Sequence, residues 1–431
     1  MPTDDRPFDR LRTAVAARRH EVVELTQALV RERSLVGDEE GAQRLIADRL
    51  AGLGFQVERV EVVPPASDPT WGYPPSLYSG RTCVVGRIEG AGTGRSLHLS
   101  GHADVVPVES AAQWEHDPWG GEVAGGRVWG RGAGDMKAGL AAYVVGAAAF
   151  LEAYGQPAGD LLFSSVIEEE CTGNGMKAVL SAGYGAEGTL IGEPSGLQLM
   201  HAGVGVIWAR LTARSGGAHP GFSTGSSSSM AILRALDGLR GLERRINERP
   251  LVPDETERPG RDQVFFAAHE HPFRLNVGSL SGGVWPSSEP AQAEARIRLG
   301  FGMELTPRDA QLLVAEAVQA AAPEVEVVFE GFRAPAYCDD LEHGLAAALS
   351  GSHELLHGSP PSRQVLPATT DARSVSGPCV CYGPVAGAIH GTDEWVDIES
   401  AEAVAAAVAI TIASWQGADA GSARGPFQLG P

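Results

Sequence analysis

Three consecutive glutamates, Glu168, Glu169 and Glu170, follow a mostly apolar segment that covers residues 161–167. The apolar run predicts a buried strand, and glutamates at its end would repel one another and lose hydration. A divalent cation would neutralise them, with Glu170 as a ligand and Glu169 left free as a general base. The alternative is a solvated acidic loop, which is what charge runs usually form.

Two further segments also end in side chains that could bind a metal ion. His102 closes the predicted strand 96–102, and Asp104 lies two residues later, where it could accept the second ring N–H of His102 and fix its tautomer. Glu193 follows the predicted strand 188–192. Open α/β sheets bind ligands beyond the carboxyl ends of their strands, so we expect these side chains at one edge. Taken alone, His102 and Asp104 more often mean a surface histidine and a turn aspartate.

Asp135 and His390 lie in loops. Asp135 belongs to the glycine-dense segment 130–139, where small residues indicate that the backbone approaches another group closely. An N-cap aspartate is the alternative. His390 follows a short loop near the C-terminus, and the five positions together supply two histidines and three carboxylates. Such a set suits zinc, with cobalt or manganese as substitutes, and Asp135 could bridge two ions about 3.5–4 Å apart.

The elements that must position these groups alternate between helix and strand. Helical periodicity over 11–31, 42–53 and 136–154, with strands between them, predicts an α/β three-layer sandwich with a mostly parallel central sheet. The order strand-helix-strand-strand-helix-strand over 205–332 predicts an inserted ferredoxin-like α+β domain. The predicted domains are a zinc-binding domain, 1–204 and 333–418, an inserted domain, 205–332, to which the family resemblance described below assigns the role of a lid or dimerisation domain, and a flexible tail, 419–431.

The composition narrows the range of partners. The chain has 431 residues and a formal net charge of −20, which argues against nucleic acid or an anionic membrane surface as the main partner. We see no apolar signal core near the N-terminus and no transmembrane run. The five scattered cysteines do not indicate a disulfide framework, so we expect a cytoplasmic protein that acts on a small molecule.

Six segments, taken in their order, resemble the dinuclear-zinc deacylases and exopeptidases. That family includes acetylornithine deacetylase, succinyl-diaminopimelate desuccinylase, aminoacylase and glutamate carboxypeptidase. The segments lie between residues 101 and 396 and read GHADVVP, WGRGAGDMKAG, IEEECTGNG, IGEPS, GGAHPG and AIHGTDEWV. Each segment is a weak signal alone, but their order at successive strand ends is specific.

The resemblance implies a role for each position. One ion would be held by His102, Asp135 and Glu193. The other ion would be held by Asp135, Glu170 and His390. Asp104 would orient His102, and Glu169 would be the general base that takes a proton from a water acidified by the ions.

His219, in the GGAHPG segment, would lie in the lid. In the family such a histidine comes from the partner subunit and donates to the oxyanion of the tetrahedral intermediate. The resemblance therefore implies a homodimer, and an ordinary loop histidine is the alternative.

The resemblance also implies substrate contacts. Arg298 matches an arginine that grips the substrate carboxylate, although Arg296 competes for that role. Arg373 lies in a stretch, TDAR, that resembles one lining the cleft of the family. The lid departs from the family pattern at Val284 and at residues 227–229, which concerns the substrate pocket and not the metal ligands.

The resulting hypothesis is a zinc-dependent amidohydrolase that removes an N-acyl group from an amino acid or a related small molecule, as acetylornithine deacetylase does. A dipeptidase or carboxypeptidase with the same dinuclear site is the alternative among enzymes. An inactive homologue that only binds a carboxylated ligand would not need five intact ligands and a base. A structural zinc protein usually has a closed, cysteine-rich site, which this carboxylate-rich set is not.

Overall fold

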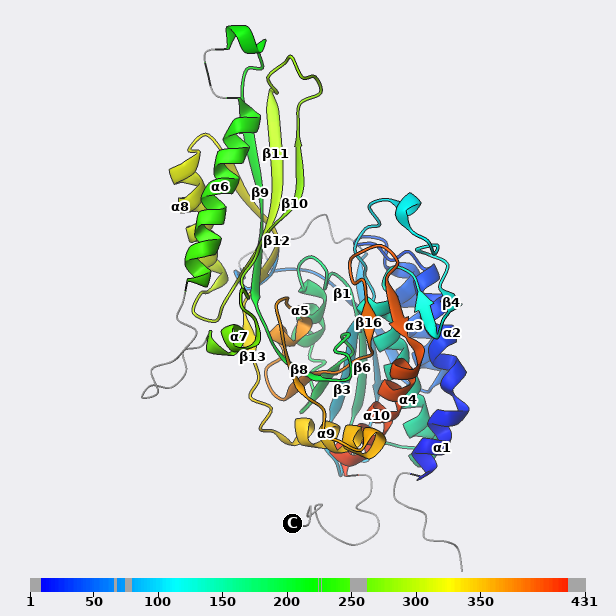
Figure 1. The fold of residues 1–431 in the computed structure, drawn as a ribbon. Coiled ribbons are helices and arrows are strands. Elements are labelled where there is room, and N and C mark those ends of the chain that lie inside the picture. Colours follow the sequence, from blue (N-terminus) through cyan, green and yellow to red (C-terminus); the bar gives the residue numbers. More distant parts are fainter. Residues whose placement is uncertain are drawn as a thin grey trace, which may run out of the picture.

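The structure is a computed structural model that describes residues 9–65, 68–73, 80–223, 225, 227–248 and 262–417. Its largest part is a nine-stranded sheet with helices against it (Figure 1). The strand order is β1-β2-β6-β3-β7-β15-β8-β13, and β14 pairs with β8. The strands are β1 Gln56–Glu61, β2 Thr82–Ile88, β3 Leu97–His102, β6 Leu161–Val166, β7 Thr189–Ile191, β8 Leu199–Gly203, β13 Tyr337–Cys338, β14 Arg363–Leu366 and β15 Cys379–Cys381.

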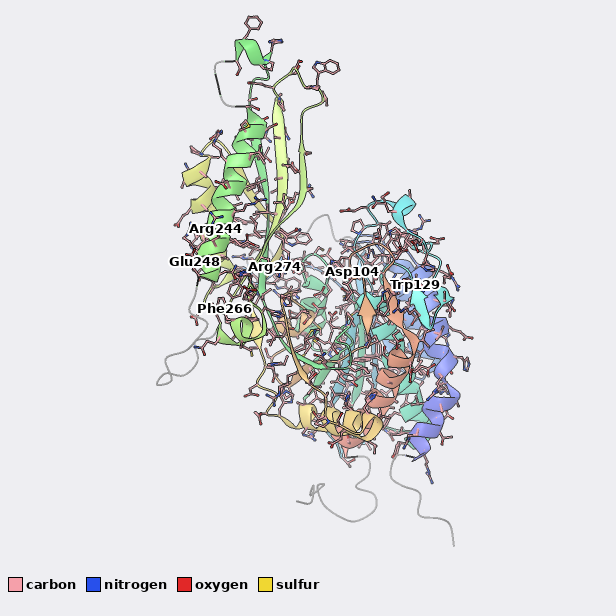
Figure 2. All side chains as sticks on the ribbon, in the orientation of Figure 1. Asp104, Trp129, Arg244, Glu248, Phe266 and Arg274 are labelled. Carbon is pink, nitrogen blue, oxygen red and sulfur yellow. The ribbon has the colours of Figure 1, made fainter. Side chains whose placement is uncertain are left out.

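The middle of this sheet is parallel. The strands β6, β3, β7 and β15 run in the same direction, whereas β1, β2 and β8 join them through antiparallel pairs. The sheet is therefore mixed, and the parallel arrangement predicted from the sequence is concentrated in its centre. Because the central strands are parallel, their carboxyl ends meet at one edge, where Asp104 lies in Figure 2.

Helices cover both faces of the large sheet. Most pack on one face around a core that includes Leu99, Leu140 and Val408, while α5 packs on the other face around Met176 and Ile191. The helix predicted over residues 11–31 is two helices, since the backbone leaves helical geometry between them. The helices are α1 Asp9–Ala17, α2 Arg19–Arg31, α3 Glu40–Gly52, α4 Ala138–Tyr154, α5 Asn174–Ser181, α9 Gly344–His357 and α10 Ile398–Gln416.

Two helical segments, 133–154 and 398–416, are long and apolar enough to cross a membrane by composition alone. Most of each is buried inside the fold, where α4 and α10 pack against each other. A helix that is apolar on all sides is expected in the core of a large domain, which accounts for both segments.

A second sheet has its own core. It is antiparallel, with the order β10-β11-β9-β12, and the helices α6 and α8 pack on one face around residues such as Leu211, Ile297 and Val314. This order is the ferredoxin-like arrangement predicted for the insert. A capping box of Thr306 and Asp309 begins α8. The elements are β9 Gly205–Arg214, α6 Ser228–Asn247, α7 Gln263–Ala268, β10 Leu275–Gly282, β11 Gln292–Phe301, α8 Pro307–Ala321 and β12 Glu326–Ala334.

The second sheet stands beside the large one. Figure 1 shows α6 and α8 on its outer side, so its other face is turned toward the large sheet. The predicted tail, 419–431, lies outside the described residues. We use the name lid for the second sheet and its helices.

A third, small sheet joins two distant parts of the chain in the order β16-β17-β5-β4. It brings the glycine-dense loop before α4 next to the loop that carries His390. Its strands are β4 Glu122–Ala124, β5 Arg127–Trp129, β16 Ala386–Gly387 and β17 Trp395–Asp397. The short helical turns are η1 Ala111–Gln113, η2 Ala133–Lys137, η3 Pro220–Phe222 and η4 Asp371–Ser374.

Candidate metal centre

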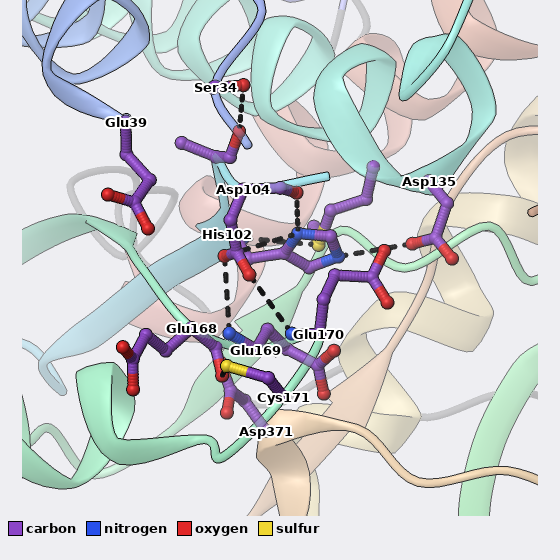
Figure 3. Close-up of polar contacts among 12 residues, drawn as sticks. Ser34, Glu39, His102, Asp104, Asp135, Glu168, Glu169, Glu170, Cys171 and Asp371 are labelled. Atoms are coloured by element: carbon purple, nitrogen blue, oxygen red, sulfur yellow. Dashed lines mark hydrogen bonds and ion pairs between the residues drawn. The ribbon is translucent and has the colours of Figure 1, made fainter. Parts of the chain in front are cut away.

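The Asp135 carboxylate lies between two imidazole rings. Its Oδ1 atom is 3.1 Å from Nε2 of His102, and its Oδ2 atom is 3.4 Å from Nε2 of His390. Glu170 reaches the same ring of His390, with Oε2 3.1 Å from Nε2. Figure 3 shows His102, Asp135 and Glu170 converging from different segments. The structure thus brings four of the five predicted ligands together, with one carboxylate shared between the two histidines.

Glu193, the fifth predicted ligand, follows β7 and joins the same cluster. One metal-binding atom from each of Glu193, Glu169 and His102 lies within 4.8 Å of the others. The Glu193 side chain is buried, and among the described residues nothing donates a hydrogen bond to its carboxylate. Burial, and then the negative charge of Asp135, raise the pKa of Glu193 well above its usual range. A buried carboxylate of this kind needs a cation beside it.

Close backbone packing sets the positions of Asp135 and His390. Asp135 departs from helical geometry within η2, and the N-cap of α4 is Lys137, so Asp135 does not cap that helix. A Cβ added to Gly139 would lie 1.9 Å from the carbonyl oxygen of Gly192, which confirms the close approach predicted from the glycines. His390 has a φ of 61°, a left-handed conformation that is costly without support from its surroundings.

The carboxylates demand positive charge at the centre. Although burial lowers the pKa of His390, Glu170 and Asp135 outweigh it and raise that pKa to about 11. Burial alone would raise the pKa of Asp135, but its contacts with His102 and His390 hold that pKa below its usual range. Divalent cations bound beside these carboxylates would supply such positive charge in the loaded protein.

The three consecutive glutamates have three different partners. Glu168 is fully buried and forms an ion pair with Arg81, a contact that was not predicted from the sequence. Glu169 accepts a hydrogen bond from Nη1 of Arg373 at 3.1 Å. Glu170 faces the histidine ring described above. The repulsion among the three glutamates is therefore reduced by a separate partner for each of them. The candidate metal centre accounts for only part of this effect.

Asp104 contacts His102, but not through the expected atoms. Nδ1 of His102 lies 2.9 Å from the backbone oxygen of Asp104 and 3.8 Å from its carboxylate. The carboxylate instead accepts the backbone N–H groups of Glu169 and Glu170, at 3.2 and 3.1 Å. Asp104 thus connects His102 to the turn that presents both glutamates. Spacing predicted the contact, whereas the atom that makes it depends on how that turn folds.

The family model for peptidase family M20/M25/M40 matches residues 98–414, a segment that contains the whole cluster. The chain belongs to peptidase family M20/M25/M40. Its place in this family makes it a hydrolase of amide bonds, as the sequence predicted.

Among similar proteins, the succinyl-diaminopimelate desuccinylase of Cereibacter sphaeroides is 29% identical over 403 residues, covering 88% of this chain and 95% of the relative. The enzyme of the same name from Methylocella silvestris is 28% identical over 413 residues, covering 92% and 98%.

Solved structures of the family share the fold. A di-peptidase from Saccharomyces cerevisiae superposes with a TM-score of 0.76 at 14% identity, covering 94% of this chain and 98% of that one. A dinuclear metal-binding M20 peptidase from Bacillus subtilis superposes with a TM-score of 0.57 at 15% identity, covering 92% and 99%. At this level of identity the likeness concerns the fold.

A buried ion pair joins the two loops of the centre in this M20 chain. Arg131 and Glu394 are 3% and 1% exposed, and Nη1 of Arg131 is 2.5 Å from Oε2 of Glu394. The other carboxylate oxygen accepts the backbone N–H groups of Gly134 and Asp135, each at 3.0 Å. Nη2 of Arg131 donates to the carbonyl of Gly391 at 2.9 Å. We call this pair the loop clamp, because it holds the backbone beside Asp135 and beside His390.

Sequence reasoning missed the loop clamp, although both residues lie in segments that carry the family resemblance. Arg131 is in WGRGAGDMKAG, and Glu394 is in AIHGTDEWV. Arg131 lies in a glycine-rich segment, and an arginine in such a segment indicates a charge that is shielded from solvent. This pattern could have indicated a buried partner of opposite charge.

The arginines predicted to bind substrate differ in their surroundings. Arg298 is half-buried and has no hydrogen bond or ion pair among the described residues, and burial lowers its pKa. Arg296 is 60% exposed and pairs with Glu294 and Glu330. The environment therefore favours Arg298 for binding an anion. The side chain of Arg373, by contrast, is buried against Glu169.

His219 lies apart from the centre within one chain. It is exposed at the start of η3, the short green helix at the upper end of the lid in Figure 1, and its Nδ1 accepts the N–H of Gly221 at 3.1 Å. Large apolar side chains are exposed in the same part of the lid, with Phe222 81%, Trp285 66% and Val284 100% exposed. One chain alone does not bring His219 to the metal centre.

Proposed function

We propose that this protein is a dinuclear-metal amidohydrolase that removes an N-acyl group from an amino acid or a related small molecule. The observation that carries the proposal is the Asp135 carboxylate, whose two oxygens each face a different histidine. A carboxylate in this position can bridge two cations. The relatives named as succinyl-diaminopimelate desuccinylases support deacylation as the reaction.

The residues present fit two divalent cations. His102, Asp135 and Glu193 would hold one, and Asp135, Glu170 and His390 would hold the other. The fit rests on the donor set and on the buried Glu193 carboxylate, to which nothing in the described part of the chain donates a hydrogen bond. Mixed imidazole and carboxylate donors suit zinc, with cobalt or manganese as substitutes. When bound, such ions polarise a carbonyl and acidify a water.

Glu169 is the general base in this proposal. Its carboxylate lies in the same cluster as His102 and Glu193, and the guanidinium of Arg373 orients it. Glu169 takes the proton of the attacking water and gives it to the leaving amine, so that proton movement balances over one turnover. The Asp104 carboxylate positions Glu169 by accepting the backbone N–H of Glu169. Arg298 would bind a substrate carboxylate.

The substrate class is tested with a panel of compounds. N-Succinyl, N-acetyl and N-formyl amino acids and simple dipeptides are incubated with the metal-loaded protein, and with a chelated sample that is then reloaded. We expect hydrolysis of at least one N-acyl amino acid that disappears on chelation and returns with metal. Hydrolysis of dipeptides alone would move the assignment to a dipeptidase, which the yeast structural neighbour represents. Absence of any hydrolysis would favour an inactive ligand-binding homologue.

The proposal includes a homodimer in which His219 acts on the partner's substrate. The exposed Phe222, Val284 and Trp285 favour an interface near this end of the lid, which would be formed by residues 205–332. Within the described residues all five cysteines are free thiols, which suits a reducing cytoplasm.

Mixed dimers test this arrangement. A subunit with Glu169→Gln is combined with a subunit carrying His219→Ala. If His219 acts across the interface, one of the two sites keeps both groups, and activity returns on mixing. If His219 acts within its own chain, the mixture remains as inactive as the separate variants.

A further inference from the structure

A cavity of about 560 Å³ lies between the lid and the large sheet. It is formed by the segment 68–71, by α5, by the start of α8, and by segments 333–335 and 373–374. We call it the cationic pocket, because four of its lining residues are basic and one is acidic. The basic residues are Lys177, Arg308, Arg333 and Arg373, and the acidic residue is Asp68.

This balance of charge is unusual for the molecule. The whole chain carries a formal charge of −20. A cavity of about 410 Å³ elsewhere in the structure is lined by Arg18 and Arg49 together with Glu21 and Asp48, so its charges cancel. Four basic groups therefore gather in the cationic pocket against the overall charge of the protein, which costs free energy unless an anion is bound there.

Most of the basic side chains have no carboxylate partner. Among the described residues, Arg308 and Arg333 make no hydrogen bond or ion pair, and Lys177 donates only to the backbone oxygen of Thr70. Asp68, the single acid, is engaged by the N–H and hydroxyl of Thr70 at 2.8 and 2.7 Å. The positive charge of the pocket is therefore left for a ligand.

Two further observations point to a ligand. Nη2 of Arg373 is buried without a hydrogen bond, and its nearest carboxylate oxygen, on Asp371, is 3.7 Å away. Burial, and then the charges of Arg373 and Arg333, lower the pKa of Lys177 to about 8. Burial and repulsion by neighbouring cations therefore act on Lys177, and one guanidinium nitrogen of Arg373 lacks an acceptor.

We propose that the cationic pocket binds a small organic anion that carries at least two carboxylates. The volume exceeds what a simple inorganic ion needs, and the ring of Trp71 with Pro307 and Pro335 supplies apolar walls for a short carbon chain. Separate guanidinium groups on different elements can each bind one carboxylate bidentately.

The pocket borders the metal centre through Arg373, whose Nη1 binds Glu169. The same dicarboxylate chemistry can therefore come from two sources, the far end of a substrate that enters the centre or a separate free anion. The binding claim stands without the proposed function. Only the choice between the two sources rests on it.

Binding is tested by calorimetric titration of succinate into the full-length protein, with zinc bound and after chelation. We expect one binding event that persists without metal, and binding of propionate weaker by about tenfold or more because it offers one carboxylate. Arg308→Gln and Arg333→Gln should each weaken succinate binding by about tenfold or more. Arg308 is exposed on α8, so its variant should fold normally.

The matched control is Arg49→Gln, which removes the same charge from the cavity whose charges cancel, and it should leave succinate binding within about twofold of wild type. The proposal is overturned if no succinate binding survives chelation, or if Arg308→Gln and Arg333→Gln bind as the control does. If the protein hydrolyses none of the compounds but still binds succinate without metal, only the proposed function is contradicted.

Kinetics on the metal-loaded protein then separate the sources, with N-succinyl and N-propionyl forms of one amino acid. If the pocket receives the substrate, Arg333→Gln raises KM for the succinyl compound and leaves the propionyl compound unchanged. If it receives a free anion, added succinate changes turnover of the propionyl compound in wild type, with saturation, and has no such effect in Arg333→Gln.

Discussion

The candidate metal centre and the cationic pocket gather charge of opposite sign, which is mostly buried at the centre and mostly half-buried or exposed at the pocket. The centre holds carboxylates at the ends of parallel strands, and the pocket holds basic groups where the lid meets the large sheet. Other buried charges form structural ion pairs, as in the contacts of Arg81 with Glu39 and Glu168. The comparison teaches that burial alone does not mark a ligand site in this fold, because charge without an opposite partner is what separates the two regions from such ion pairs.

The first prediction concerns Glu169, the proposed general base of the centre. Glu169→Gln removes a proton acceptor while keeping side-chain volume, so turnover should fall by about 10²–10⁴ while bound zinc is unchanged. The measurements are kcat on a substrate found in the panel and metal content by mass spectrometry. Near-wild-type turnover would remove Glu169 from that role.

The second prediction concerns the loop clamp, which touches neither metal nor substrate. Glu394→Gln weakens the hold on the backbone of Asp135 and on Arg131, so zinc affinity should fall by about 10–100-fold. Competition with a chelator measures that affinity. Glu122→Gln, in the neighbouring β4 and exposed, is the matched control and should bind zinc as wild type does.

The third prediction addresses Arg373, which joins the two regions. Arg373→Gln frees the Glu169 carboxylate and removes one basic group from the pocket. We expect kcat to fall by about tenfold and succinate binding to weaken as well, with zinc retained. A change in only one of the two measurements would show that the regions are independent.

Much of the centre was predictable from the sequence. Because parallel strands end at one edge, the positions of His102, Glu170 and Glu193 after apolar runs were enough to expect a cluster. The ferredoxin-like order of the lid also followed from its pattern of elements. The contact between Asp135 and His390 required more, since these residues lie far apart in the sequence and meet through a small sheet with short strands.

The rest depended on tertiary packing. Nothing in the run of three glutamates indicates that Glu168 would turn toward Arg81 while Glu169 meets Arg373, because a left-handed residue at Glu168 redirects the chain. The cationic pocket is assembled from segments that are distant along the chain, and the sequence as a whole is acidic, with a net charge of −20, so its composition does not indicate such a pocket. The fold alone therefore determines which charged residues have a partner of opposite charge and which do not.

The fourth prediction concerns the buried ion pairs that Arg81 forms. We expect substitution of Arg81 to have the smallest effect on the centre. Arg81→Gln leaves Glu39 and Glu168 buried without their cation, so the free energy of unfolding should fall by about 3–5 kcal/mol. Zinc content and turnover per folded molecule should stay near wild type. Denaturant unfolding gives the first quantity, and a loss of zinc in the folded variant would contradict the separation of this ion pair from the centre.

The bridging position of Asp135 is the central claim, and metal stoichiometry tests it most directly. Native mass spectrometry of the zinc-loaded protein should show two ions per chain in the wild type. Asp135→Asn should bind both ions more weakly, because its carboxylate contacts both histidines, and should hold fewer than two under the same conditions. Two tightly held ions in Asp135→Asn, or full turnover by a wild-type chain that holds none, would contradict the account.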